Sequence, residues 1–194
     1  MAHNEFEGER IRLRAVEPED AEFWYESGLD TEFDRRGGQT HLPSSRAAFR
    51  QRAEEAAKAR DDDSVALTIE TLDGTVVGGL GVGIRNTRSR VFDYGIGLYQ
   101  EHRRKGYGTE ALDLLFRFYF RELGYLKVEA GVYGFNESSL RFHEAFGFVV
   151  EGRRRRAVFT MGTYHDIEVY AKPHLFTSHG LVGDHSSESW RHAA

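Results

Sequence analysis

A change of hydrophobic period near residue 106 constrains the fold of this 194-residue chain more than any other feature. Before this point, short segments alternate polar and apolar residues as strands do, whereas after it apolar residues recur at helical spacing. One helical face, at i, i+3, i+4, i+7 and i+11, is formed by Leu112, Leu115, Phe116, Tyr119 and Leu123. Gly124 follows as a C-terminal stop. The spacing therefore predicts a helix over residues 106–123.

The other segments predict an α/β domain with a mixed sheet. Strands are expected over residues 10–15, 65–72, 75–84, 91–98, 126–133, 148–157 and 163–171. Further helices are expected to begin at Pro18, to run from a cap at Ser44 or Ser45 to about residue 60, and to span residues 137–145. Asp73-Gly74 is a hairpin turn signal between two of the strands.

The composition fits one soluble globular domain over residues 1–176, followed by a mobile tail over residues 177–194 that is rich in Ser, His and Gly. Hydrophobic residues make up 40% of the chain, which is enough for a sizeable core. Cysteine is absent, which excludes disulfides, thiolate metal sites and a cysteine nucleophile. No apolar run is long enough for a membrane span and no signal peptide is recognisable, so we expect a cytoplasmic protein.

Charge is distributed unevenly along the chain. The net charge is −5, and the excess of acidic side chains lies within residues 1–63. This balance argues against a uniformly basic nucleic-acid binder. The acidic region is either an ordinary solvated surface or a surface that attracts a cationic partner.

Two glycine-rich segments have different contexts. Residues 78–83 lack the Gly-Lys-Ser/Thr ending of a phosphate loop and no helix follows them, so these glycines are expected to permit a bulge or a close backbone approach. Residues 103–108, Arg-Arg-Lys-Gly-Tyr-Gly, instead lie between a predicted strand and the start of the periodic helix. Backbone N–H groups, the helix dipole and three cations would together favour a bound pyrophosphate, although a helix start with surface cations is the simpler alternative.

The run from Gly95 to Ala111 resembles the acetyl-CoA site of the GNAT acyltransferases, whose core pattern is Arg/Gln-x-x-Gly-x-Gly/Ala. The run from Asn136 to Phe148 is similar to their second motif. Residues 161–166, Met-Gly-Thr-Tyr-His-Asp, resemble the closing hairpin of the RimJ/RimL-like branch, which contains ribosomal-protein N-terminal acetyltransferases. The resemblance covers roughly residues 8–173, with the motifs in the family order.

This resemblance implies a mixed, mostly antiparallel sheet of about seven strands, flanked by about four helices and splayed between strands 91–98 and 126–133. An acyl-pantetheine arm would pair with the first of these strands, and the pyrophosphate would lie on the loop that follows. The implied acetyl-CoA-binding residues are Leu98, Tyr99, Arg103, Arg104, Lys105, Gly106, Tyr107, Gly108, Thr109, Asn136 and Ser139.

The implied reaction is direct transfer of an acetyl group from acetyl-CoA to a primary amine in a ternary complex, with no metal. The acceptor would be an amine-bearing small molecule or a protein N-terminus, and the resemblance allows a homodimer. One alternative is a catalytically silent acyl-CoA-binding regulatory module. Another is an RNA-associated protein that acts through the cationic run Arg153–Arg156, whose simpler interpretation is a solvated strand edge.

The sequence departs from the family pattern at two positions. Arg104 replaces a usual glycine of the loop, and His143 stands where many relatives place a tyrosine that protonates the leaving thiolate. His143 is therefore either the general acid or a half-exposed helix residue. Ser139 is the second candidate acid, and its alternative role is in the first turn of a helix that Asn136 caps. Asn136 would then both cap the helix and touch the cofactor.

A general base is less clearly marked. Asp93 lies in the strand before the site, and Glu26 and Asp34 lie in the acidic region. A carboxylate near the path of the amine would accept its proton, directly or through water. Of these three carboxylates, Asp93 is the expected general base. Residues 26–44 and 85–90 are expected to form the acceptor side.

Overall fold

The computed structural model describes residues 4–38, 40–59 and 64–174. Seven strands form one sheet in the order β1-β2-β3-β4-β5-β7-β6. The strands are β1 (Ile11–Ala15), β2 (Ser64–Thr71), β3 (Val76–Asn86), β4 (Val91–Leu98), β5 (Lys127–Tyr133), β6 (Val149–Thr160) and β7 (Thr163–Pro173). The helices are α1 (Ala21–Ser27), α2 (Thr31–Gly37), α3 (Arg46–Lys58), α4 (Tyr107–Arg117) and α5 (Glu137–Ala145). Short helical turns are η1 (Pro18–Asp20), η2 (Gln100–His102) and the π-helical η3 (Phe118–Glu122).

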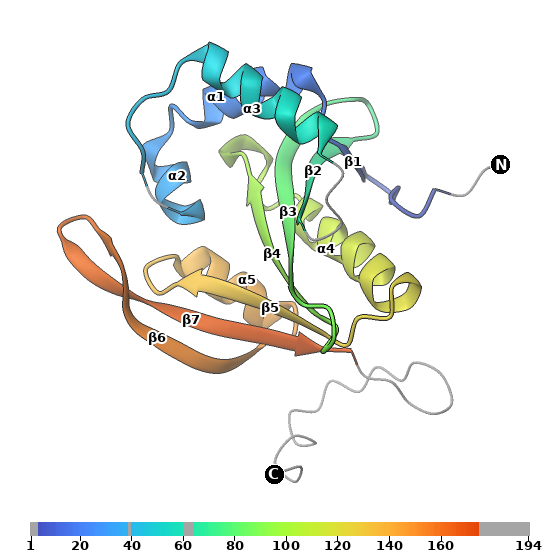
Figure 1. The fold of residues 1–194 in the computed structure, drawn as a ribbon, viewed down its shortest axis with the longest axis vertical. Helices are drawn as coiled ribbons and strands as arrows, with labels where there is room; N and C mark the ends of the chain where they lie inside the picture. Colours follow the sequence, from blue (N-terminus) through green and yellow to red (C-terminus); the bar gives the residue numbers. More distant parts are fainter. Residues whose placement is uncertain (1–3, 39, 60–63, 175–194) are drawn as a thin grey trace, which may run out of the picture.

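The sheet is split between β4 and β5. Every neighbouring pair of strands is antiparallel except this one, which is parallel and pairs only residues 91–93 with residues 127–129. Beyond Asp93 and Glu129 the two strands diverge, so that β1–β4 and β5–β7 form the two arms of a V (Figure 1). The expected mixed sheet of seven strands, splayed between the fourth and fifth, is therefore confirmed.

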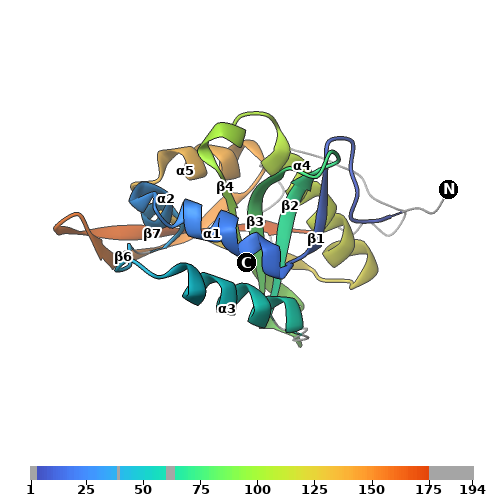
Figure 2. The same cartoon turned by 90° about the horizontal axis from the view of Figure 1, so that it is seen from above.

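Helices cover both faces of the sheet, with α4 and α5 on one side and α3 on the other (Figure 2). The periodic face of α4 is buried as predicted, and Leu112 and Leu115 are fully inaccessible. Phe92 of β4 stacks on Tyr119 of η3 with ring centroids 4.5 Å apart, which fastens the continuation of this helix to the centre of the sheet. The prediction fails at Leu123, which is 49% exposed, because the α-helix gives way to η3 and loses its register.

One helix was not predicted. α2 occupies part of residues 26–44, which were expected to form the acceptor side, and it raises the count from about four helices to five. Asp30 caps it, because its Oδ1 accepts the N–H groups of Glu32 and Phe33. The helix is short and largely polar, so hydrophobic periodicity gave no signal for it. The other caps were foreseen: Ser45 caps α3 and Asn136 caps α5.

A buried ion network joins β1, η1 and β2. Asp20 is 2% exposed and accepts two hydrogen bonds from Arg14 at 2.8 Å and one from the Thr68 hydroxyl at 2.7 Å. Burial raises the pKa of Asp20, but the hydrogen bonds from Arg14 and other donors outweigh it, and the net pKa is lowered. Arg14 also pairs with Glu70 of β2. The acid-rich N-terminal region is thus tied into the sheet.

The remaining expectations can be located in the structure. Residues 78–83 lie in β3, and a Cβ on Gly78 would clash with the carbonyl oxygen of Gly97, so close backbone approach is the reason for this glycine. The expected mobile tail over residues 177–194, and the boundary at residue 176, lie outside the described residues. In the described ranges, no helix is both long and apolar enough to cross a membrane.

Candidate functional site

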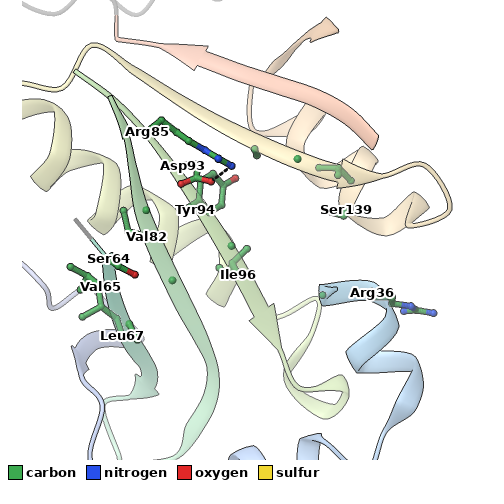
Figure 3. Close-up of a pocket in the computed structure, with 18 of the residues that line it drawn as sticks. Arg36, Ser64, Val65, Leu67, Val82, Arg85, Asp93, Tyr94, Ile96 and Ser139 are labelled. Atoms are coloured by element: carbon green, nitrogen blue, oxygen red, sulfur yellow. Dashed lines mark ion pairs between the residues drawn. The ribbon is translucent and has the colours of Figure 1, made fainter. Parts of the chain in front are cut away.

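A cleft of about 960 Å³ opens where β4 and β5 diverge (Figure 3). It extends across β2, β3 and β4 on the side that α3 covers, and it reaches α5 at Ser139 and His143. Its floor includes the cross-strand pair Gly81 and Gly95. A Cβ on either residue would meet nothing within 4 Å, so neither packing nor a neighbouring group requires glycine there.

The loop between β4 and α4 presents unpartnered backbone donors. The first hydrogen bond of the helix runs from the Glu110 N–H to the Gly106 carbonyl. Among the described residues, no group accepts the N–H groups of residues 104–109. Arg104 and Gly106 both have positive φ, at 60° and 83°, which turns the chain tightly at this point. Such a loop before an eleven-residue helix is a good binding site for a phosphate group.

The cations of this loop point in different directions. Arg103 folds back, and its Nε donates to the Leu98 carbonyl at 2.9 Å while its guanidinium lies over the ring of Phe33. Burial lowers the pKa of Arg103, and the nearby Arg36 adds to this effect. Arg104 and Lys105 are exposed, and within the described part of the chain neither forms an ion pair. These two side chains therefore remain available to an anion.

The main-chain groups of Leu98, the last residue of β4, and of Tyr99, which follows it, face opposite sides. The Tyr99 N–H donates to the Val77 carbonyl of β3, so this donor is already used within the sheet. Because successive residues of a strand direct their main-chain groups to opposite edges, those of Leu98 face the splay. The ring of Tyr99 packs against Phe33, and burial raises the pKa of Tyr99 to about 12. Leu98 thus has an N–H that could pair with an extended ligand.

Three other cofactor candidates lie at the start of α4. Gly108 is buried against Leu98 and Phe142, so that the helix comes close to the end of β4. Tyr107 is half-buried and packs on the main core, whereas Thr109 is exposed in the first turn. Tyr107 therefore packs on the hydrophobic core and also belongs to the start of the helix after the loop.

His143 is buried, which corrects the alternative of a half-exposed helix residue: it is only 4% exposed and lines the base of the splay. Its Nδ1 lies 2.7 Å from the Ser139 carbonyl oxygen and its Nε2 lies 2.9 Å from the Tyr94 hydroxyl. A carbonyl only accepts, so Nδ1 carries the proton and Nε2 accepts from Tyr94. Burial lowers the pKa of His143, which favours this neutral form.

Ser139 and Asn136 approach the same point from the start of α5. Asn136 Oδ1 accepts the Ser139 N–H at 3.2 Å, and its side-chain amide donates to the Arg36 carbonyl of α2. The Ser139 hydroxyl lies 3.4 Å from Nδ1 of His143 and borders the cleft. Asn136 is therefore a helix cap that also joins α5 to α2, and Ser139 is a hydroxyl at the cleft wall.

Asp93 lies at the point where the strands begin to separate. Its carboxylate lines the cleft and pairs with Arg85 at 2.5 Å (Figure 3). The structure thus brings together the three predicted catalytic residues, Asp93, Ser139 and His143, around one cleft. The other base candidates, Glu26 and Asp34, are not among its lining residues.

Two features of the site escaped sequence reasoning. Tyr94 is buried on β4 and hydrogen-bonds His143, and its place in an apolar strand pattern gave only a core signal. Arg10 contacts the loop before α4 from 95 positions away in the sequence, and no local pattern marks such a pair. The cationic run Arg153–Arg156, in contrast, is mostly solvated. Within it, Arg153 pairs with Glu168, and Arg154 lines the cleft.

A splayed mixed sheet with an anion-binding loop between β4 and α4 is the architecture of the GNAT fold. The sequence matches the Acetyltransferase (GNAT) domain family over residues 10–149. The protein therefore belongs to the GNAT acetyltransferase family. Among the described residues, no cluster of three or more His, Asp or Glu side chains could hold a metal ion.

A curated relative agrees with this assignment, and solved structures share the fold. The SPbeta prophage-derived uncharacterized N-acetyltransferase YokL of Bacillus subtilis is 34% identical over 166 residues, covering 86% of this chain and 91% of that protein. A spermidine N-acetyltransferase of Vibrio cholerae, solved in complex with CoA and spermine, has a TM-score of 0.74 at 20% identity and covers 84% of this chain and 95% of its own. A GNAT-family acetyltransferase of Bacillus anthracis has a TM-score of 0.73 at 19% identity, with coverages of 87% and 97%.

Proposed function

We propose that the protein is an acetyl-CoA-dependent N-acetyltransferase that acts on a primary amine. The observation that carries the proposal is the row of unpartnered N–H groups at residues 104–109, placed directly beside the splay. Backbone donors at a helix start suit a pyrophosphate, and an open strand edge suits an extended arm. The open strand edge belongs to β4, and the backbone donors belong to the loop and the start of α4, which follow β4 in the chain.

The residues of the loop fit CoA on chemical grounds. Acetyl-CoA would supply an activated thioester to the cleft. Gly106 and Gly108 keep the backbone accessible to a phosphate, and the exposed Arg104 and Lys105 would add positive charge. Leu98 would offer its N–H to the pantetheine arm, while Tyr99 and Arg103 would support this strand end by packing.

We assign the proton transfers to groups that line the cleft. The amine must lose one proton as it attacks, and Asp93 would accept it, directly or through water. The departing sulfur must gain one proton, and Ser139 is the hydroxyl at the cleft wall that can donate it and recover it from water. The neutral His143, with its Nδ1 proton held by a carbonyl, would orient Ser139 rather than act as the acid.

The cleft narrows the range of acceptors. Among the residues that the structure describes, Arg36, Arg85 and Arg154 line it together with one carboxylate, Asp93. The three arginines make this described part of the lining less favourable for a polycation. An amine-bearing small molecule of low positive charge or a protein N-terminus fits it better. The RimJ/RimL-like motifs favour the protein N-terminus.

Calorimetric titration with acetyl-CoA, with CoA and ATP as controls, tests the proposal first. Selective binding of acetyl-CoA and CoA is expected, and no binding by a well-folded sample would overturn the acetyltransferase assignment. An assay of CoA thiol release against a panel of amines comes second. Binding without release across the whole panel would favour the silent acyl-CoA-binding module instead.

A further inference from the structure

Arg10 lies immediately before β1, yet its side chain reaches α4 and the loop in front of that helix. Its Nε donates to Glu110 Oε2 at 2.7 Å, and its backbone N–H donates to Glu110 Oε1 at 2.8 Å. Its Nη1 donates to the Lys105 carbonyl oxygen at 2.9 Å. The guanidinium therefore fastens the loop that carries the unpartnered N–H groups to the start of the sheet.

The bond to Lys105 determines the direction of the next backbone donor. In a trans peptide, the carbonyl and the following N–H point in opposite directions, and the described chain contains no cis peptide. Because Arg10 holds the Lys105 carbonyl on its own side, the Gly106 N–H points to the opposite side of the loop. Arg10 thus fixes a donor that it does not touch.

Gly106 is shaped by the same contact. Its φ is +83°, and a Cβ there would lie 2.6 Å from Nη1 of Arg10. The left-handed backbone is the reason for glycine here, and a side chain at this position would also displace the guanidinium that lies beside it. The position of Arg10 and the conformation of the loop therefore depend on each other.

Glu110 has an electrostatic part in the arrangement. A carboxylate in the first turn suits the helix dipole, but left unpaired it would repel a phosphate bound to the same helix start. Burial raises the pKa of Glu110, but the hydrogen bonds from the backbone and side chain of Arg10 outweigh it and the net pKa is lowered. The charge persists, and Arg10 compensates it.

We propose that Arg10 is a positioning residue for the pyrophosphate of CoA. It holds the loop in the conformation that directs the Gly106 N–H toward the ligand, and it neutralises Glu110 beside that site. The proposal rests on the proposed acetyl-CoA-dependent function.

The test compares Arg10→Met with Arg12→Met. Arg12 lies two residues along on β1 and pairs with Glu70, away from the loop, so its loss is a matched removal of one arginine–glutamate pair, and Glu70 keeps Arg14 as a partner. Titration with CoA is expected to give about tenfold weaker binding for Arg10→Met, the usual effect of losing a charged hydrogen bond, and unchanged binding for Arg12→Met. Arg10→Lys, which keeps the charge but not the forked geometry, should fall in between.

A kinetic comparison separates positioning from general damage. With acetyl-CoA, Arg10→Met should raise KM and leave kcat nearly unchanged, whereas with acetyl-pantetheine, which lacks the pyrophosphate, KM should not change. Wild-type affinity for CoA in Arg10→Met, or an equal loss in Arg12→Met, would overturn the role of Arg10 alone. Absence of CoA binding by the wild-type protein would overturn this role together with the proposed function.

Discussion

Arg104 shows how a single residue can be strained at a functional loop. Its φ of 60° lies in the left-handed region, where a side chain costs about 1–2 kcal/mol. The family pattern has glycine at this position, and glycine adopts this conformation without that cost. The protein thus keeps a cation beside the proposed phosphate site at some cost in stability.

Replacing Arg104 with glycine and with alanine separates the backbone effect from the charge. Both variants lose the guanidinium, so both should bind CoA more weakly than the wild type and to a similar extent. Only glycine relieves the left-handed conformation, so Arg104→Gly should be more stable than Arg104→Ala by about 1 kcal/mol. Urea unfolding measures the difference, and equal stabilities would show that the loop relaxes to negative φ.

The buried His143 makes the free energy of unfolding depend on pH. Burial lowers the pKa of His143 in the folded protein, so below about pH 6.5 the unfolded chain binds the additional proton more readily. This contribution to stability is therefore complete above that pH and is lost as the pH falls toward the lowered pKa. Tyr94 faces the ring and stays protonated, because burial raises the pKa of Tyr94.

The variant His143→Asn checks this expectation. It retains a donor for the Ser139 carbonyl but cannot titrate, so its stability should fall less than that of the wild type between pH 7.5 and 5.5. Denaturant unfolding at the two values measures both proteins. Parallel losses in the wild type and the variant would assign the pH dependence to other groups.

At the scale of elements, two positions in the central strands hold glycine although packing does not require it there. Gly81 on β3 and Gly95 on β4 are exposed, opposite each other, and open above. Glycine in a strand costs roughly 0.5–1 kcal/mol relative to alanine, so their presence is better explained by the space that they leave in the cleft. Gly78, which lies against Gly97, is the contrasting case in which packing requires glycine.

Alanine at Gly81 or Gly95 should therefore raise the free energy of unfolding by roughly 0.5–1 kcal/mol while lowering kcat/KM for bulky amines. Gly152→Ala is a matched control, because that glycine on β6 is equally open but lies outside the cleft lining. It should gain stability without a change in activity. Retained activity of Gly81→Ala and Gly95→Ala toward the largest acceptors would show that the floor does not limit them.

The elements themselves were predictable where local chemistry decides them. Hydrophobic periodicity predicts the helix after residue 106. The turn at Gly74 was predictable because its positive φ suits glycine. α2 was missed because its one apolar side chain, Phe33, gains its burial from β4 and the loop, as the contacts of Phe33 with Gly97 and Tyr99 show. Tertiary contacts of this kind leave no periodic signal in the sequence.

The candidate site was predictable to a different extent. The proposed phosphate-binding loop follows from local sequence, but the environment of His143 on α5 depends on Tyr94 of β4, and the Arg10 contact spans 95 positions. A sequence places His143 on a helix without saying whether it is buried. Protonation and positioning are therefore properties of the assembled molecule.

For the whole molecule, the proposed function predicts a thermal shift. Acetyl-CoA at about 100 times its dissociation constant should raise the free energy of unfolding by roughly 2.7 kcal/mol. For a chain of this size, that corresponds to an increase in Tm of roughly 5–10 °C. Differential scanning fluorimetry with acetyl-CoA and with ATP at equal concentration measures it, and equal shifts would indicate nonspecific anion binding.

The divergence of β4 from β5 also bears on aggregation. It leaves two unpaired strand edges in the middle of the sheet, and unpaired edges can template association with other chains. Here both edges are recessed within the V, with α2 lying opposite the β6–β7 hairpin at its mouth (Figure 1). A single slender chain can enter between the arms, whereas the edge of another folded sheet cannot. The geometry of the splay thereby shields these two inner edges from edge-to-edge pairing.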